Sequence, residues 1–351
     1  MNIVIVQPNI RRYRADFFDA LAKYLDHLTV VHFGIDESLP EHSFERIKLD
    51  DSRFGRLMSI HQLVSIQLKN DVSIVVFDIN YWKVLVAAAL SSLVKPVLFW
   101  GHGLGRRRIG QILRRFCLLW GKGVIVYGNA GRDQLLKAGI SQERIFVARN
   151  TQVVPGFMDY SHEKKEYFLF VGRLQERKRI DLLLKAYAEY ISYDPSASMG
   201  LTIVGDGPIF AALKEMGRSL KIDSRVKFVP GTTDPDKLET LYRHALAYVS
   251  PGHVGLGVLH GFAFGVPVVT FQADTHAPEF ENLVHDINGL VLEPCCSSLA
   301  DSLLQLATVP ELAERLGHEA FRTYIEKAHP DQMVLAFLNA LKFATSARGR
   351  E

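Results

Sequence analysis

The chain has 351 residues, of which 48% are hydrophobic and 23% charged, a composition typical of a folded globular protein rather than a disordered one. This length exceeds what one hydrophobic core comfortably fills and favours two domains. The longest strongly apolar run, residues 84–94, is shorter than the roughly 20 residues that cross a bilayer and predicts a buried helix.

Cysteine content and the amino terminus indicate the compartment. Only Cys117, Cys295 and Cys296 are present, and adjacent cysteines do not readily form a disulfide with each other. No metal-binding spacing occurs, so we expect no metal and a reducing, cytoplasmic setting. No basic stretch precedes an apolar one at the start of the chain, so we expect no secretory leader.

The formal net charge of +3 is unevenly distributed. Residues 1–150 contain 21 Lys and Arg against 13 Asp and Glu, whereas the rest of the chain contains 20 against 25. The first part is therefore expected to favour anionic partners, such as lipid headgroups or a charged substrate. An uneven but solvated surface is the alternative.

The first 150 residues alternate short apolar runs with helical patterns. Asn2–Gln7 predicts a buried parallel strand that Pro8 closes, and residues 15–25 predict a helix. Further strands are expected at residues 28–33, 74–77, 97–100, 124–127 and 145–148. Strands that alternate with helices indicate a doubly wound parallel sheet.

A second series of strands follows a break in the pattern. Pro, Gly, Ser and charged residues at about 155–166 predict a linker. The later strands are expected at residues 167–171, 201–204, 226–229, 247–249 and 266–271. We therefore predict an α/β protein with Rossmann-like domains at residues 1–155 and 166–330, and a last helix within 331–351. Such sheets bind ligands beyond the carboxyl ends of their strands, so the site is expected in the cleft where the two domains face each other.

Two basic side chains follow the first strand of the second series. Arg173 comes directly after Gly172, and Lys178 precedes the helical run that starts near Ile180. A guanidinium fork and a mobile ammonium at a strand end suit a diphosphate. Two cations that merely start a helix would be disfavoured by the helix dipole.

A glycine turn follows the next strand. Gly205-Asp206-Gly207-Pro208 would let backbone approach a ligand closely. A dinucleotide fingerprint needs a third glycine, and Phe210 occupies that position, which argues against a nicotinamide enzyme. A plain tight turn is the alternative.

Together these motifs resemble the nucleotide-sugar half of glycosyltransferase family 4, whose members have the GT-B fold. The resemblance covers most of residues 1–345, with the specific motifs in 168–290. It implies transfer of a sugar from a nucleoside diphosphate sugar to a hydroxyl acceptor, with retention and without a metal or a further cofactor. Arg173 and Lys178 would then be catalytic, because they hold the diphosphate and stabilise the leaving group. The resemblance also implies that the last helix crosses back onto the first domain.

Residues 251–267 depart from the family pattern. The family usually has two glutamates eight positions apart, and Gly252 and His260 stand there in this chain. Neutral His260 could accept one hydrogen bond from the ribose, and a satisfied helix histidine is the alternative. Gly255, Gly257 and Val258 would bring backbone N–H groups to a phosphate. This pattern suggests a divergent subgroup. For His253, in the preceding loop, a functional and a structural role are both open.

The other expected donor and acceptor residues follow from the same resemblance. Pro230 ends a segment that flanks the base in the family. Glu279, in the run His276-Ala277-Pro278-Glu279, resembles the family's Gly-Gly-x-Pro-Glu segment, which implies contact with sugar hydroxyls; capping of a helix is the alternative. His102, between two glycines at a strand end, is the third residue expected to be catalytic and would contact the sugar or the donor phosphate; a simple turn histidine is the alternative.

Two arginine-rich stretches lie in the first domain. Arg11, Arg12 and Arg14 replace the glycines that the family often has in its first loop, and would face an anionic acceptor, the diphosphate or only water. Residues 106–115 alternate arginines with apolar residues, which predicts contact with an anionic membrane; packing of the apolar residues against the sheet is the alternative. No nucleic-acid motif is present, and we expect no nucleic-acid partner.

The sequence thus favours a hexosyltransferase-type enzyme acting on a saccharide or lipid-linked saccharide in cell-surface polysaccharide or glycolipid assembly. A non-catalytic sugar-nucleotide-binding subunit remains open, because both glutamates are missing. A GT-B sugar-nucleotide epimerase remains open as well.

Overall fold

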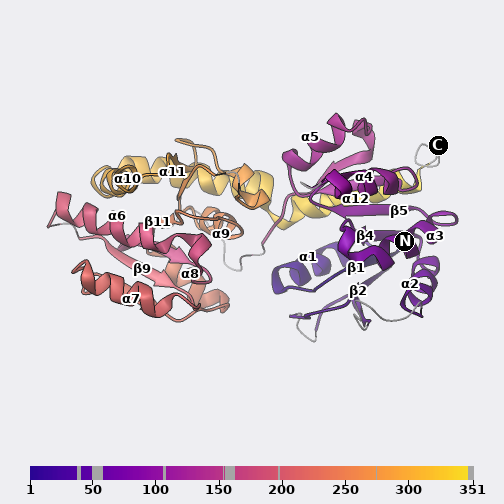
Figure 1. Cartoon of the computed structure of the whole chain (residues 1–351), viewed down its shortest axis with the longest axis horizontal. Coiled ribbons are helices and arrows are strands. Elements are labelled where there is room, and N and C mark those ends of the chain that lie inside the picture. The colour runs from indigo at the N-terminus through magenta and orange to yellow at the C-terminus, as the bar shows by residue number, and fades with distance from the viewer. Residues whose placement is uncertain are drawn as a thin grey trace. The chain divides into compact units, whose positions relative to one another are not determined.

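A computed structural model describes residues 1–37, 41–49, 58–105, 108–152, 154, 163–196, 198–273 and 275–346. The chain forms two compact units, Met1–Val153 with His329–Glu351, and Val154–Ala328. Each unit is built on one parallel sheet flanked by helices (Figure 1). In the described part of the chain no helix combines the length and apolar character that crossing a bilayer requires.

The first unit contains a seven-stranded sheet in the order β3-β2-β1-β4-β5-β6-β7, and each neighbouring pair is parallel. Its strands are β1 (Asn2–Gln7), β2 (His27–His32), β3 (Glu45–Lys48), β4 (Val72–Val76), β5 (Val97–Gly101), β6 (Gly123–Val126) and β7 (Ile145–Val147). Its helices are α1 (Arg12–Ala22), α2 (Met58–Lys69), α3 (Trp82–Ser92), α4 (Arg108–Cys117), α5 (Asn129–Lys137) and α12 (Pro330–Thr345), with short turns η1 (Ile79–Tyr81) and η2 (Gln142–Arg144).

The second unit repeats the arrangement with six strands in the order β10-β9-β8-β11-β12-β13, again parallel throughout. Its strands are β8 (Tyr167–Val171), β9 (Gly200–Val204), β10 (Val226–Val229), β11 (Ala245–Val249), β12 (Val268–Phe271) and β13 (Gly289–Leu292). Its helices are α6 (Ile180–Tyr193), α7 (Phe210–Ser219), α8 (Pro235–Arg243), α9 (Gly257–Ala263), α10 (Cys296–Thr308) and α11 (Pro310–Thr323), with short turns η3 (Glu176–Lys178), η4 (Pro278–Asn282) and η5 (Tyr324–Ala328). In both units the strand order reverses beside the first strand, so the predicted pair of doubly wound parallel sheets is confirmed.

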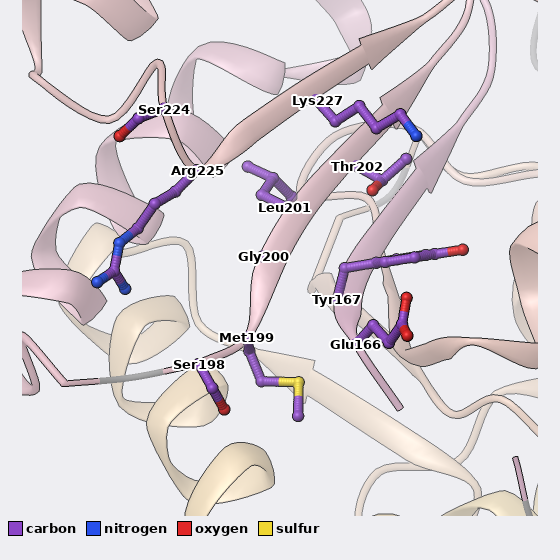
Figure 2. Close-up of a pocket in the computed structure, with 10 residues that line it drawn as sticks. All are labelled: Glu166, Tyr167, Ser198, Met199, Gly200, Leu201, Thr202, Ser224, Arg225 and Lys227. Carbon is purple, nitrogen blue, oxygen red and sulfur yellow. The ribbon is translucent and has the colours of Figure 1, made fainter. Parts of the chain in front are cut away.

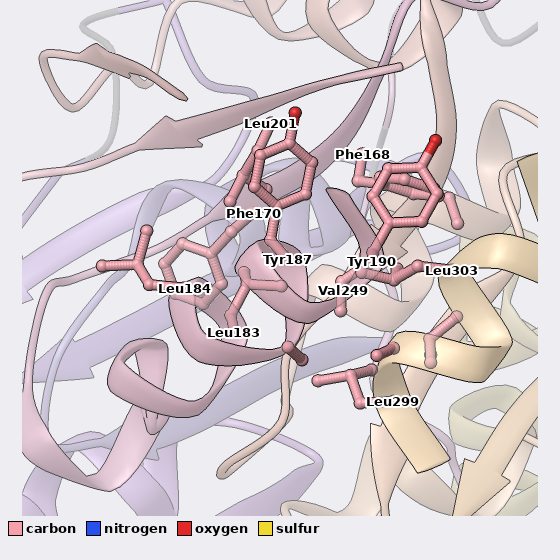
Figure 3. Close-up of a cluster of buried hydrophobic side chains, with 14 of the residues drawn as sticks. Phe168, Phe170, Leu183, Leu184, Tyr187, Tyr190, Leu201, Val249, Leu299 and Leu303 are labelled. Carbon is pink, nitrogen blue, oxygen red and sulfur yellow. The ribbon is translucent and has the colours of Figure 1, made fainter. Parts of the chain in front are cut away.

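The core of the second unit holds β8 firmly. Phe168 and Phe170 lie in one buried cluster with side chains of α6 and α10, and Leu169 lies in a second cluster on the other face. Figure 3 shows the first cluster, where α6 supplies Leu183, Leu184, Tyr187 and Tyr190. Burial on both faces fixes β8, which Gly172 follows.

The last helix, α12, belongs to the first unit and completes its core. The Phe337 ring lies 4.8 Å from the rings of Phe17 and of Trp100, both edge-on. The predicted return of the final helix to the first domain is therefore present.

Three features differ from the sequence-based expectation. β3 and β13, which lie at the sheet edges, were not predicted. The prediction that the helix at 84–94 is buried is wrong for one face of α3. Val84 and Leu85 are buried, whereas Leu90 is 51% exposed. Leu93, beyond the end of that helix, is 83% exposed.

Candidate functional site

The candidate site lies at the carboxyl edge of the second sheet. The strand order reverses between β8 and β11, and ligands of doubly wound sheets bind where it does so. The segments that leave β8, β9, β10 and β11 carry most of the predicted donor residues, so this edge brings them together.

Gly205 and Gly207 are glycines because two backbone segments lie unusually close. The Gly172 amide donates to the Val204 carbonyl and the Leu174 amide to the Asp206 carbonyl, both at 2.9 Å. A Cβ on Gly205 would lie 1.9 Å from the Gly172 oxygen, and one on Gly207 would lie 2.1 Å from the Leu174 oxygen. The turn is therefore an extension of the β8–β9 ladder, which gives these glycines a steric role whether or not a ligand binds beside them.

Asp206 connects this ladder to the next loop. Its exposed carboxylate accepts a hydrogen bond from the Gly231 amide at 3.0 Å. Pro230, immediately before Gly231, is exposed. Both predicted donor residues thus lie on the rim of the sheet edge.

Lys178 is held by the loop that follows β11. Its ammonium donates to the His253 carbonyl at 2.6 Å. The backbone joins the same two segments, because the Gly252 amide donates to the Lys178 carbonyl at 3.1 Å and the His253 amide to the Arg177 carbonyl at 2.9 Å. A Cβ on Gly252 would lie 2.2 Å from the Arg177 oxygen. This backbone therefore leaves no room for a side chain at position 252.

The environment of Lys178 lowers its affinity for a proton. Burial, and then the positive charge of Arg177, lower the pKa of Lys178 to about 8, while the carboxylate of Glu279 acts in the opposite direction. Glu279 itself is buried in η4, and its Oε2 would lie 3.9 Å from a Cβ on Gly255. Lys178 and Glu279 thus lie close enough for their opposite charges to interact.

Arg173 differs from Lys178 in exposure. Its side chain is exposed, and it makes no hydrogen bond or ion pair to any residue that the structure describes. An exposed guanidinium of this kind can bind a ligand phosphate without first breaking an ion pair to a described residue.

Two histidines line the same loop cluster. His276 is fixed as a neutral ring, because its Nδ1 accepts from the Val254 amide at 3.1 Å and its Nε2 donates to the Phe271 carbonyl at 2.8 Å. The His253 ring lies 6.5 Å from the His276 ring. Burial, and then Arg177 and Lys178, lower the pKa of His253, so it is neutral at physiological pH. The structural role of His276 was not foreseen from the sequence.

Helix α9 places the remaining predicted donor residues. The Val258 side chain lies in the core, and its amide donates to the Gly255 carbonyl at 3.0 Å. Gly257 packs against the Tyr248 hydroxyl, which a Cβ would approach to 2.4 Å. The His260 ring lies 5.5 Å from the Tyr242 ring, and burial lowers the pKa of His260 to about 4. The donor contacts expected of these residues stay predictions.

The predicted residues of the first unit lie at its own sheet edge. His102 follows β5, is exposed, and its ring lies 4.7 Å from the Tyr127 ring. Arg11 forms an ion pair with Glu37. The loop placement of Arg14 is wrong, because α1 begins at Arg12 and Arg14 lies buried in its first turn.

The arginine-rich stretch of the first unit forms α4; Arg106 and Arg107 lie outside the described residues. The alternative that its apolar side chains pack against the sheet is wrong for most of them. The exposed ones are Ile109, Ile112, Leu113, Phe116 and, just beyond the helix, Leu119. Arg114 points inward instead: its Nη1 donates to the Leu104 carbonyl at 2.9 Å, and its Nη2 lies 3.6 Å from Asp78.

A hollow lies at the opposite edge of the second sheet. Figure 2 shows this open cavity of about 490 Å³, which the starts of β8, β9 and β10 line with Tyr167, Thr202 and Lys227 among others. It is separate from the carboxyl edge that carries Arg173 and Lys178, because the strands run between them.

The chain is similar to known glycosyltransferases. Residues 159–323 match the family described as glycosyl transferases group 1. Over 109 residues the chain is 38% identical to a D-inositol 3-phosphate glycosyltransferase of Rhodococcus opacus, which covers 28% of this chain and 24% of that protein. Over 265 residues it is 23% identical to the N-acetyl-alpha-D-glucosaminyl L-malate synthase of Bacillus anthracis, which covers 66% and 68% of the two chains.

A solved structure extends the likeness to both units. Anabaena HepE in complex with UDP superposes with a TM-score of 0.77 at 16% identity and covers 97% of this chain and 100% of that one. The chain therefore has the GT-B fold, as predicted. The sequence matches support the broad family of group 1 glycosyl transferases. The match to the Rhodococcus relative spans about a quarter of that protein's length.

Proposed function

We propose that this protein is a glycosyltransferase that moves a hexosyl group from a nucleoside diphosphate sugar to a hydroxyl acceptor with retention. The observation that carries the proposal is the half-buried Lys178 ammonium, held 2.6 Å from the His253 carbonyl at the sheet edge that also presents the open guanidinium of Arg173. Two cations at a doubly wound switch point suit a diphosphate. The group 1 match to residues 159–323 supports the same conclusion.

The chemistry assigned to these residues is neutralisation of charge. As the bond from the anomeric carbon to the diphosphate breaks, negative charge develops on the leaving oxygen, and Arg173 and Lys178 stabilise it without a metal. The acceptor hydroxyl attacks the anomeric carbon from the face that the diphosphate leaves, and the departing phosphate takes its proton. Preorganised cations at this position would raise the rate because they cost little reorganisation during the reaction.

Recognition of the donor sugar falls to Glu279 and to the neighbouring loops. The buried carboxylate of Glu279 lies beside Gly255 and interacts with Lys178. The sugar hydroxyls next to the diphosphate would lie at this position. Gly172, Asp206, Pro230, Gly257 and the neutral His260 complete the proposed donor site. Because Gly252 and His260 replace the two glutamates, we assign the chain to a divergent subgroup of family 4.

Surface chemistry suggests where the enzyme works. Helix α4 exposes 75% of Ile109 and 66% of Phe116, with Arg108 and Arg115 exposed beside them. An apolar face flanked by cations suits an anionic bilayer. We therefore propose a cytoplasmic enzyme that contacts the membrane through α4 and builds cell-surface polysaccharide or glycolipid. His102 would contact the sugar or the donor phosphate.

The test is binding and turnover with a panel of UDP-, GDP- and dTDP-linked sugars. A donor that binds should raise the unfolding temperature of the wild-type protein, and product analysis should show sugar transferred with an unchanged anomeric configuration. Binding without turnover in the presence of acceptors would identify a non-catalytic subunit. An isomerised nucleotide sugar formed without acceptor would identify an epimerase.

A further inference from the structure

The first unit buries an arginine at the carboxyl edge of its own sheet. Arg14 is only 7% exposed. Its guanidinium carbon lies 4.4 Å from the centre of the Trp100 ring, 5.1 Å from that of Tyr13 and 5.3 Å from that of Tyr127. Tyr13 lies in α1, which follows β1, Trp100 lies near the end of β5, and Tyr127 follows β6, so the cation lies where a doubly wound sheet binds its ligand.

The positive charge of Arg14 has no acidic partner within the described residues. Its Nη2 donates to the Asn150 side-chain oxygen at 3.0 Å and makes a long contact of 3.5 Å with the Tyr127 hydroxyl. Both partners are neutral, and no described carboxylate forms an ion pair with it. Glu37 is already engaged, because it pairs with Arg11 and accepts from the Arg12 amide. Buried charges are normally paired, and aromatic faces compensate only part of the cost of removing a cation from water.

Two further observations concern the segments that carry Arg14 and its partner Asn150. The first turn of α1 contains no acidic residue, although its dipole favours negative charge there. Arg149, the sequence neighbour of Asn150, has a buried Nε atom without a hydrogen-bond partner among the described residues.

We propose that the carboxyl edge of the first sheet is an anion site in which Arg14 binds a phosphate or carboxylate group carried by the acceptor. This inference rests on the proposed function, because it assigns the donor to the second unit and the acceptor to the first. It narrows the acceptor class to a phosphorylated or carboxylated hydroxyl compound. A planar guanidinium packed among rings is preorganised for such a group.

The experiment separates this site from the diphosphate site. Four proteins are compared, all of which carry Arg173→Ala and Lys178→Ala: the parent of that background, Arg14→Gln, Arg14→Lys and the exposed control Arg12→Gln. Inorganic phosphate is titrated into each at constant ionic strength, and thermal unfolding reports binding. We expect phosphate to raise the unfolding temperature of the parent and Arg12→Gln proteins, about tenfold more phosphate to be needed with Arg14→Lys, and no effect with Arg14→Gln.

A second measurement identifies the source of the anion. With intact Arg173 and Lys178, transfer to glycerol 3-phosphate is compared with transfer to glycerol. We expect the wild type to prefer the phosphorylated acceptor by about 100-fold in kcat/KM, and Arg14→Gln to lose that preference while its KM for the donor changes less than twofold. Loss of UDP binding in Arg14→Gln with the acceptor preference intact would assign Arg14 to the donor diphosphate and overturn the proposal.

Failure of this site and failure of the proposed function are distinguishable. Phosphate protection that is the same with and without Arg14 overturns the anion site even if transfer is observed. Absence of any donor binding or turnover overturns the proposed function while the phosphate titration still decides the site. If Arg14→Gln does not fold, the titration of Arg14→Lys decides: an affinity for phosphate equal to that of the parent protein overturns the proposal.

Discussion

The two sheets place cations at the same topological position but in different surroundings. In the second unit, Arg173 is open to water and Lys178 has a carbonyl at 2.6 Å and the Glu279 carboxylate nearby. In the first unit, Arg14 lies among three rings with neutral hydrogen-bond partners. The second edge loses little stability without a bound ligand, because Arg173 is solvated and the charge of Lys178 is compensated by a carbonyl and by Glu279. At the first edge no described carboxylate pairs with Arg14, so the anion that we propose would balance its buried charge.

The largest effect that this contrast predicts is loss of transfer when Lys178 is removed. Lys178→Ala should lower kcat/KM for transfer about 1000-fold, because one preorganised donor to the leaving group is lost. Lys185→Ala, which removes an exposed lysine of α6, is the matched control and should behave as wild type. Steady-state kinetics with a binding donor check both, and circular dichroism checks the fold. Activity within tenfold of wild type in Lys178→Ala would contradict the diphosphate clamp.

The next largest effect is a loss of stability when the backbone segments that follow β8 and β9 are forced apart. Gly205→Ala should lower the free energy of unfolding by about 3 kcal/mol, because its methyl group meets the Gly172 carbonyl at 1.9 Å. Gly217→Ala in α7 has no atom within 4 Å of the new methyl group and should instead stabilise by about 0.5–1 kcal/mol. Urea unfolding of both variants measures the difference. Equal effects from the two substitutions would disprove the steric role of Gly205.

The pH dependence should distinguish the two edges. The folded-state pKa of Lys178 is lowered from 10.5 to about 8, and only the protonated ammonium binds the diphosphate. As pH rises through about 8, kcat/KM for the donor should therefore fall, by about tenfold per pH unit above that value. Lys178→Arg keeps its charge over this range and should lose the alkaline limb, although its geometry is less favourable. A limb that persists in Lys178→Arg would belong to another group.

The smallest expected effect concerns the membrane face of the first unit. Ile112→Ser combined with Phe116→Ser removes two exposed apolar side chains from α4 and should weaken binding to phosphatidylglycerol vesicles about tenfold, since less apolar area enters the bilayer. Leu335→Ser, at a position of α12 that is 54% exposed, is the control. Co-sedimentation with vesicles measures both. Equal binding by the two variants would show that α4 is not the contact surface.

The fold was predictable from the sequence where strands are buried on both faces. Asn2–Gln7 and Tyr167–Val171 read as continuous apolar runs, and the structure has both at the predicted bounds. β3 was not predicted because it is an edge strand with the sequence Glu-Arg-Ile-Lys. Charged edge strands of this kind have no pattern of apolar residues. Periodicity also placed the start of the first helix at residue 15, three residues late, which left Arg14 in a loop.

The site was predictable only in part because its constraints come from distant segments. The motif around Arg173 and Lys178 is local, and it lies at the expected sheet edge. Position 252 requires glycine because the carbonyl of Arg177 lies against it. Arg14 is buried because it packs against Trp100 and Tyr127. Neither contact can be inferred from the spacing of residues in the sequence. The same holds for His276, whose two ring nitrogens bind backbone groups on both sides of it.

The position of α12 has a consequence for the order in which the protein matures. Its Phe337 packs on Phe17 and Trp100, so the core of the first unit needs residues that the ribosome adds after the whole second unit. The second unit can therefore fold before the first unit is complete. Until α12 has been synthesised, the first unit exposes the apolar surface that α12 covers. During synthesis the anion site around Arg14, which shares Trp100 with that core, is completed last.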